Sequence, residues 1–193
     1  MDGDFVAGVD GCKRGWVWFK LYDSGRTKTE LVNLVDVLQR RPDGLRAVAI
    51  DIPIGLLDAS RACDKAARQR LGWPRRNSVF SPPCRAALAG VDYAEMCNIN
   101  KSIVGARLTK QSCAIVPKIK EVDDAITPAH QSWVFEVHPE VCFWHFAGEK
   151  AMEHKKKSRA GREERLRVLT RYLPGIAEHL ASRPNGVAKR RSA

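Results

Sequence analysis

No segment of this 193-residue chain approaches the ~20 consecutive apolar residues that a transmembrane helix needs. The first residues, Met1-Asp2-Gly3-Asp4, also lack the basic and apolar regions of a secretory signal peptide. These absences predict a cytoplasmic protein with no membrane partner. The sequence carries no pattern that indicates an oligomeric state.

Disulfide, zinc and phosphate-loop patterns are missing too. The six cysteines include no CxxC pair, and the five histidines form no HExxH motif and no His/Cys cluster. Isolated cysteines in a reducing compartment are usually small core residues. Neither a Walker A loop nor a GxGxxG segment is present. We therefore expect neither a disulfide scaffold nor a zinc site.

What is present is an ordinary globular composition, 44% hydrophobic and 28% charged, with a net charge of +11. We expect a single domain over residues 1–182 and a basic, disordered tail over residues 183–193. Residues 150–193 hold 13 Lys or Arg against 4 Glu, so most of the excess positive charge lies there. This concentration predicts a nucleic-acid partner, although a solvated basic helix and tail would look the same.

Apolar alternation in the first third of the chain predicts a sheet. We expect strands at residues 5–10, 16–22 and 27–32, a helix at 35–40, and a strand that ends at Asp51. This β-β-β-α-β order predicts an α/β fold.

The following segment, about 58–127, is expected to be a helical insertion. Its helices should run from Asp58 or Ser60 to Leu71, from Asp92 to about Ile103, and from Thr109 with a break at Pro117; residues 72–85 should form a loop. A last strand at 133–138, a helix that starts at Pro139, and an amphipathic helix at 161–173 complete the prediction.

Two apolar runs each end in an aspartate, Asp10 in the first and Asp51 in the second. A third acid, Glu136, lies within the last predicted strand. A carboxylate in a core strand is costly to bury unless it is paired or binds a metal. If these strands are neighbours, the three side chains can converge on Mg²⁺ or Mn²⁺, which prefer oxygen ligands. The alternative is that each aspartate stabilises the turn that follows it.

Several charged residues are candidates for binding a phosphate-bearing substrate. Lys13, Arg14, Arg61 and Arg68 could hold phosphates, and Asp64 lies on the same predicted helix face as Arg61 and Arg68. Lys118, Glu121 and Asp123 could instead form a surface ion-pair set, although Glu121 could also act as a substitute ligand. His138 and Glu140 could act on substrate or cap the helix that follows them.

Short blocks in a fixed order resemble the DUF429 family. They are Gly8–Cys12 with Gly15–Val17, Asp51–Leu56, Arg61–Asp64 with Ala67-Arg68 and Leu71-Gly72, Ser78–Phe80, Lys110-Gln111, Pro117–Asp123, Glu136–Glu140, Lys156-Lys157, Gly161-Arg162 and Arg165-Leu166. The resemblance implies a ribonuclease-H-like mixed sheet with a helical C-terminal part, and a metal-dependent nuclease in which Asp10, Asp51 and Glu136 occupy the acidic positions. Members of the family usually continue into a final helix with further aspartates, where this sequence has Arg183 to Arg191 instead.

Three functions are therefore expected in descending order. The first is phosphodiester hydrolysis in nucleic acid with Mg²⁺ or Mn²⁺ as cofactor. The second is nucleic-acid binding by a catalytically impaired protein of the same fold, which lacks the final acidic helix. The third is nucleotide binding of the actin and Hsp70 type, which needs two such domains where this length suggests about one.

Overall fold

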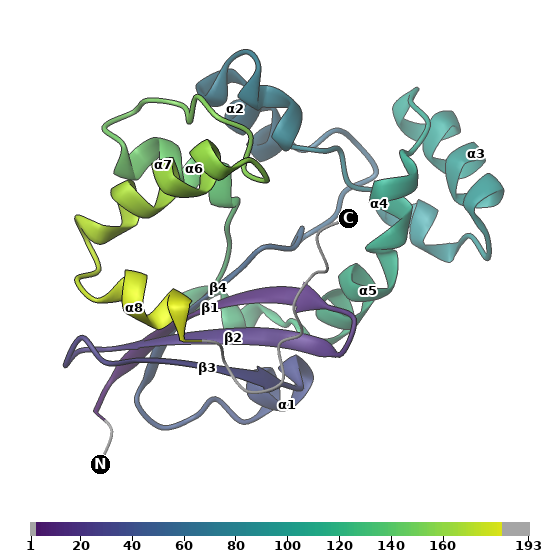
Figure 1. Ribbon diagram of the computed structural model, residues 1–193. Helices are drawn as coiled ribbons and strands as arrows, with labels where there is room; N and C mark the ends of the chain where they lie inside the picture. Colours follow the sequence, from purple (N-terminus) through teal and green to yellow (C-terminus); the bar gives the residue numbers. More distant parts are fainter. Residues whose placement is uncertain (1–2, 183–193) are drawn as a thin grey trace. The chain divides into compact units, whose positions relative to one another are not determined.

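The computed structural model describes residues 3–182 (Figure 1). The chain divides into two compact units, and each is interleaved along the sequence. The first unit comprises Met1–Asp51, Thr127–Phe135 and Glu153–Ala193, and the second comprises Ile52–Ile126 and Glu136–Met152. Within residues 3–182, every helix is too short or too polar to span a bilayer.

The first unit is organised around a mixed five-stranded sheet with the order β3-β2-β1-β4-β5 (Figure 1). The strands are β1 (Phe5–Cys12), β2 (Gly15–Tyr22), β3 (Thr27–Val32), β4 (Leu45–Ile50) and β5 (Val134–Glu136), with helix α1 (Leu34–Gln39) between β3 and β4 in the chain. β1 and β2 are antiparallel, as are β2 and β3, whereas β1 and β4 are parallel. The α/β class predicted from the sequence is confirmed.

Aromatic side chains on alternate positions hold the β1–β2 hairpin together. Trp16 and Trp18 are almost fully buried, as strand alternation requires of residues that share one face. The Phe5 ring lies 6.4 Å from that of Trp18 and 5.3 Å from that of Tyr22. Such aromatic pairs add to the stability that their buried area provides. The stable hairpin therefore provides β1 as an ordered pairing partner for the parallel strand β4.

Two helices in the last part of the chain also belong to the first unit, α7 (Arg159–Thr170) and α8 (Ile176–Ala181). The amphipathic helix expected at 161–173 is α7, but α8 has no counterpart in the sequence-based prediction. The His179 ring of α8 contacts β3, because its two nitrogens lie 2.8 Å from the hydroxyls of Thr27 and Thr29. These two tertiary contacts thus fix the short helix. The predicted disordered tail lies outside the described residues.

The second unit is almost wholly helical, in agreement with the predicted insertion. Its elements are α2 (Ala62–Leu71), η1 (Arg75–Ser78), η2 (Arg85–Ala89), α3 (Tyr93–Val104), α4 (Lys110–Ala114), α5 (Val116–Ala125) and α6 (Pro139–Phe146). The cap at Asp92 is confirmed, because its carboxylate accepts the Glu95 N–H at 2.8 Å. The start of α2 is corrected, because neither Asp58 nor Ser60 caps it. Asp58 accepts the N–H of Ala86 instead, and the helix begins after Arg61.

Candidate functional site

Asp10 lies in β1, and Asp51 is the first residue after the neighbouring parallel strand β4, both in the first unit. Val9 of β1 is in register with Ile50 of β4, and the Asp51 N–H donates to the Val9 carbonyl at 3.1 Å. Each aspartate directly follows one of these paired residues, so the two backbones run side by side at this point, with Asp51 in the bend just beyond β4. Backbones of adjacent strands are about 5 Å apart, a spacing at which two carboxylates can share one cation.

The Asp10 carboxylate is held in a partly desolvated position. The residue keeps an exposed surface, yet partial burial of its carboxylate raises the pKa, while the Gly11 N–H and the Lys156 charge oppose that rise. In the described part of the chain no salt bridge engages Asp10. Asp51 is half-buried and does have interactions with its surroundings. A desolvated acid without a salt bridge is the kind of oxygen donor that binds a hard cation.

Two basic residues of the first unit are related to the sheet end that holds Asp10 and Asp51 (the aspartate edge), Lys13 by its place in the sequence and Lys156 by its charge. Lys13 is exposed in the β1–β2 turn, only three residues beyond Asp10. Lys156 belongs to the basic loop that precedes α7, and its charge acts on Asp10. Two contacts fix the start of this loop, because Glu164 of α7 accepts the backbone N–H groups of Glu153 and His154. The edge therefore combines two acids with cations that can bind phosphate.

Glu136, the third predicted acid, belongs to the second unit and contacts other groups of that unit. It ends β5, and its carboxylate accepts the Ile54 N–H at 2.8 Å and bonds to the Arg61 guanidinium. The Arg61 side chain is only 7% exposed, and it also lies 3.5 Å from an Asp64 oxygen. Glu136 therefore neutralises a buried guanidinium. Convergence of Glu136 with Asp10 and Asp51 on shared metal ions stays a prediction.

Cys63, Asp64 and Glu136 form a compact group, with potential ligand atoms all within 4.8 Å of one another. Burial raises the pKa of Asp64, and Glu136 adds to that rise, while Arg61 opposes it. Burial also raises the pKa of the Cys63 thiol, which keeps it from becoming a thiolate. Because Arg61 already neutralises two of these three groups, the cluster fits an ion-pair network better than a metal centre.

The remaining predicted substrate-binding residues all lie in the second unit. Arg68 donates to the Val79 carbonyl at 3.0 Å and to the Ser81 hydroxyl at 2.9 Å, so it braces the loop after η1. Lys118 and Glu121 pair with each other at 2.8 Å on α5.

Asp123 pairs with Arg85, a residue outside the expected set of Lys118, Glu121 and Asp123. His138 is the N-cap residue of α6, but its side chain does not cap the helix: Nε2 bonds to the Ser78 carbonyl at 3.1 Å. Its Nδ1 is buried and makes no hydrogen bond within the described residues. Glu140 is buried in the first turn of α6, where the helix dipole favours a carboxylate.

A comparison with protein families identifies the chain. The family model described as "Protein of unknown function (DUF429)" matches residues 8–193, which is nearly the whole sequence. The chain belongs to the DUF429 family. No curated protein and no solved structure matches it significantly. The resemblance seen in the ordered sequence blocks is thus confirmed.

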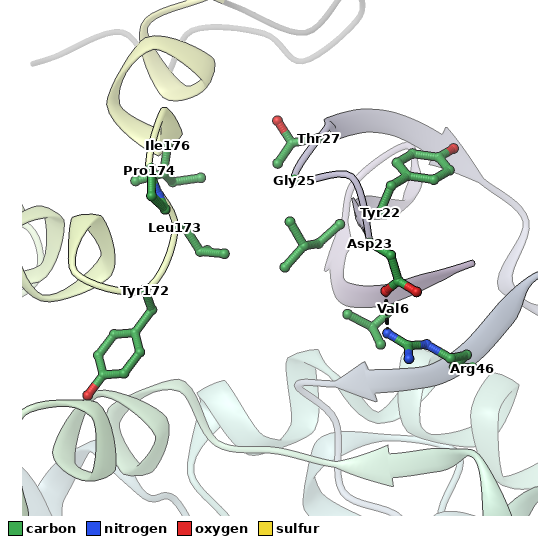
Figure 2. Close-up of a pocket in the computed structure, with 11 residues that line it drawn as sticks. Val6, Tyr22, Asp23, Gly25, Thr27, Arg46, Tyr172, Leu173, Pro174 and Ile176 are labelled. Atoms are coloured by element: carbon green, nitrogen blue, oxygen red, sulfur yellow. Dashed lines mark hydrogen bonds and ion pairs between the residues drawn. The ribbon is translucent and has the colours of Figure 1, made fainter. Parts of the chain in front are cut away.

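The first unit of this DUF429 chain also contains a pocket of about 300 Å³ (Figure 2). One wall is the segment from Tyr172 to Ile176, and the other comes from β1, β2, β4 and the turn that leads into β3. The two charged residues that line it, Asp23 and Arg46, pair with each other, as the dashed line in Figure 2 shows. This pocket is mainly apolar and its two charged residues neutralise each other, so its lining provides no reactive group.

A larger pocket of about 680 Å³ lies in the second unit. Lys65, Arg76 and Arg107 line it together with the predicted residues Arg61, Asp64 and Arg68. Sequence reasoning missed the first three, because they lie on separate elements and no local spacing links them. The only available signal was their charge, which is too common on protein surfaces to single them out.

Proposed function

We propose that this DUF429 protein is a divalent-metal-dependent nuclease that hydrolyses phosphodiester bonds in nucleic acid. The observation that supports the proposal is that Asp10 of β1 lies beside the end of β4, where Asp51 directly follows the strand, with no described salt bridge to Asp10. The strand order and the mixed sheet are compatible with a ribonuclease-H-like fold, which is part of the same proposal.

The residues present fit a hard cation. Two carboxylates offer oxygen donors, and Mg²⁺ commonly uses one or two carboxylates plus substrate phosphate. Asp10 and Asp51 would hold the ion, which when bound would supply Lewis-acid activation of water and of the phosphate. Lys156 and Lys13 would attract the phosphate backbone and orient it over the aspartate edge. Mn²⁺ belongs to the same oxygen-preferring group and is the alternative cofactor.

The test has two readouts, cation binding and cleavage. Calorimetric titration with Mn²⁺ should show a site that Asp10→Asn and Asp51→Asn each weaken by at least tenfold. Single-turnover cleavage of labelled DNA and RNA in Mg²⁺ or Mn²⁺ should be lost in the same variants. Asp36→Asn is the matched control, because Asp36 is an exposed acid of the same unit on α1. Cleavage that survives both Asp10→Asn and Asp51→Asn would refute the proposal.

A second candidate is nucleic-acid binding without catalysis. The observation that favours it is the bond between Glu136 and Arg61, which commits the third acid to a guanidinium. In that case the chain should bind labelled nucleic acid, with affinity that falls steeply as salt rises, and should cleave none of it. Binding that is undetectable at low salt would exclude both candidates.

A further inference from the structure

The larger pocket of the second unit has a strongly positive lining. Its wall is built from α2, η1, the segment 79–84, the end of α3 and the loop that precedes α4. Five cations and one acid line it, namely Arg61, Lys65, Arg68, Arg76, Arg107 and Asp64. Its volume of about 680 Å³ is within the usual range of small-ligand sites. Charge and size together indicate an anionic ligand larger than a single ion.

Three of the five cations already have partners in the protein, and one of them, Arg107, hydrogen-bonds the Cys97 side chain. Glu136 and Asp64 neutralise Arg61, and Arg68 bonds to the loop after η1. Within residues 3–182, no carboxylate forms an ion pair with Lys65, Arg76 or Arg107. Three cations around one cavity repel one another unless an anion lies between them. The lining therefore favours a ligand with a concentrated negative charge, such as a phosphate.

The polar part of the wall is fixed before any ligand arrives. The Asn100 side chain, only 3% exposed, accepts the Cys84 N–H at 2.8 Å and donates to the Ala106 carbonyl at 2.7 Å. Ser112 donates to the Ser81 carbonyl at 3.0 Å. These bonds join the segments on either side of the pocket. A wall that is held in this way costs less to order on binding, which favours affinity.

Apolar and aromatic residues line the same cavity beside the cations. They are Val79, Phe80, Pro82, Pro83, Val104 and Leu108. Inorganic phosphate alone would not contact these apolar residues favourably, because its oxygens form hydrogen bonds with donors. A ligand that joins a phosphate to a flat apolar ring would use both parts of the wall, since aromatic side chains such as Phe80 stack on nucleobases.

We propose that this pocket binds a nucleotide, with its phosphate between Lys65, Arg76 and Arg107 and its base against the wall that contains Phe80. The inference goes beyond the nuclease function, because it uses neither Asp10 nor Asp51 and requires no metal ion. It assigns the second unit a binding site of its own.

The experiment is calorimetric titration of the full chain at low salt with EDTA present. AMP should bind at least tenfold more tightly than either adenosine or inorganic phosphate. Arg76→Gln and Arg107→Gln should each weaken AMP binding by about fivefold to twentyfold, because each removes a charge-assisted bond. The adenosine signal should stay unchanged in both variants. Phe80→Leu should weaken AMP and leave phosphate unaffected.

Two controls keep the test specific. Lys101→Gln removes an exposed cation of α3 that does not line the pocket, and it should leave AMP affinity unchanged. Asp10→Asn should bind AMP as the unaltered chain does, so that a failed nuclease assay and a failed nucleotide assay are distinguishable. Equal affinity for AMP and phosphate would overturn the proposal. So would AMP binding that both arginine variants leave intact, or an oligonucleotide that binds to these residues when AMP does not.

Discussion

Replacing Glu136 by alanine tests whether this acid neutralises Arg61 or serves chiefly as a ligand. In the structure its carboxylate accepts two hydrogen bonds, from the Ile54 N–H and from the Arg61 guanidinium. The Glu136 side chain is 28% exposed, whereas that of Arg61 is only 7% exposed. The change would therefore leave a nearly buried guanidinium with Asp64 and one backbone carbonyl as its remaining partners.

The magnitude follows from these contacts. A hydrogen bond to a charged group contributes roughly 1.5–3 kcal/mol, and an unsatisfied buried N–H adds roughly 1 kcal/mol or more. The remaining contact between Arg61 and Asp64 and the partial exposure of Glu136 reduce the sum. We expect Glu136→Ala to lower the free energy of unfolding by about 2–4 kcal/mol, which is in the lower range for breaking a buried pair.

Urea unfolding followed by circular dichroism measures this difference. With an m value of about 2 kcal/mol/M, the urea midpoint should fall by roughly 1–2 M. The control is Glu163→Ala, because Glu163 pairs with Arg159 on the surface of α7, where the Arg159 side chain is 88% exposed. That change should cost less than about 0.5 kcal/mol. If both substitutions lower the urea midpoint equally and only slightly, Glu136 has no structural role, and it would again be a candidate metal ligand.

Gly161→Ala should destabilise the chain by roughly 1–3 kcal/mol, because a Cβ there would lie 2.0 Å from the Lys155 carbonyl oxygen. Gly8→Ala, where an added Cβ meets no atom within 4 Å, should be neutral, and equal thermal midpoints for the two variants would contradict the packing argument. Glu164 makes the stability of the chain depend on pH. Burial raises the pKa of its carboxyl, but hydrogen bonds from the Glu153 and His154 N–H groups and the charges of Arg165 and His154 lower it by more. The pKa therefore lies below its ordinary 4.5. Its contribution to stability is complete above that value and is lost as pH falls through the lowered pKa, so Glu164→Gln should flatten the change in urea midpoint between about pH 5 and about pH 3.

The sheet could be predicted because its strands carry a local signal. Alternating burial in β1 and the aromatic run of β2 fall where the sequence pattern put them, and β3 matches its predicted bounds of 27–32. The last strand is shorter than predicted, three residues instead of six. Pro139 explains the loss at the end of the strand, because it begins α6 and His138 already serves as its N-cap. At the start, Trp133 is the C-cap of the short 3-10 helix Pro128–Ser132.

The features that the prediction missed depend on residues far apart in the chain. α8 follows Gly175, whose φ of 84° is typical of glycine, and it is held by contacts from His179 to residues of β3. Arg61 and Glu136 were each candidates, but no local pattern joins two residues that are 75 positions apart. The pairing of β1 with β4 has no local signal either, because β2 and β3 lie between them in the chain, and the sequence analysis could only assume it.

The interleaving of the two units has a consequence for how the protein is made. The chain passes between them four times, after Asp51, Ile126, Phe135 and Met152. During synthesis the first 51 residues emerge with β1 to β4, but β5 and α7 follow only after most of the helical unit has left the ribosome. The nascent sheet therefore waits with its β4 edge unpaired, a state in which exposed strands can pair wrongly. No single cut would release either unit as a continuous fragment, so expressing one alone would require joining segments that the gene keeps apart.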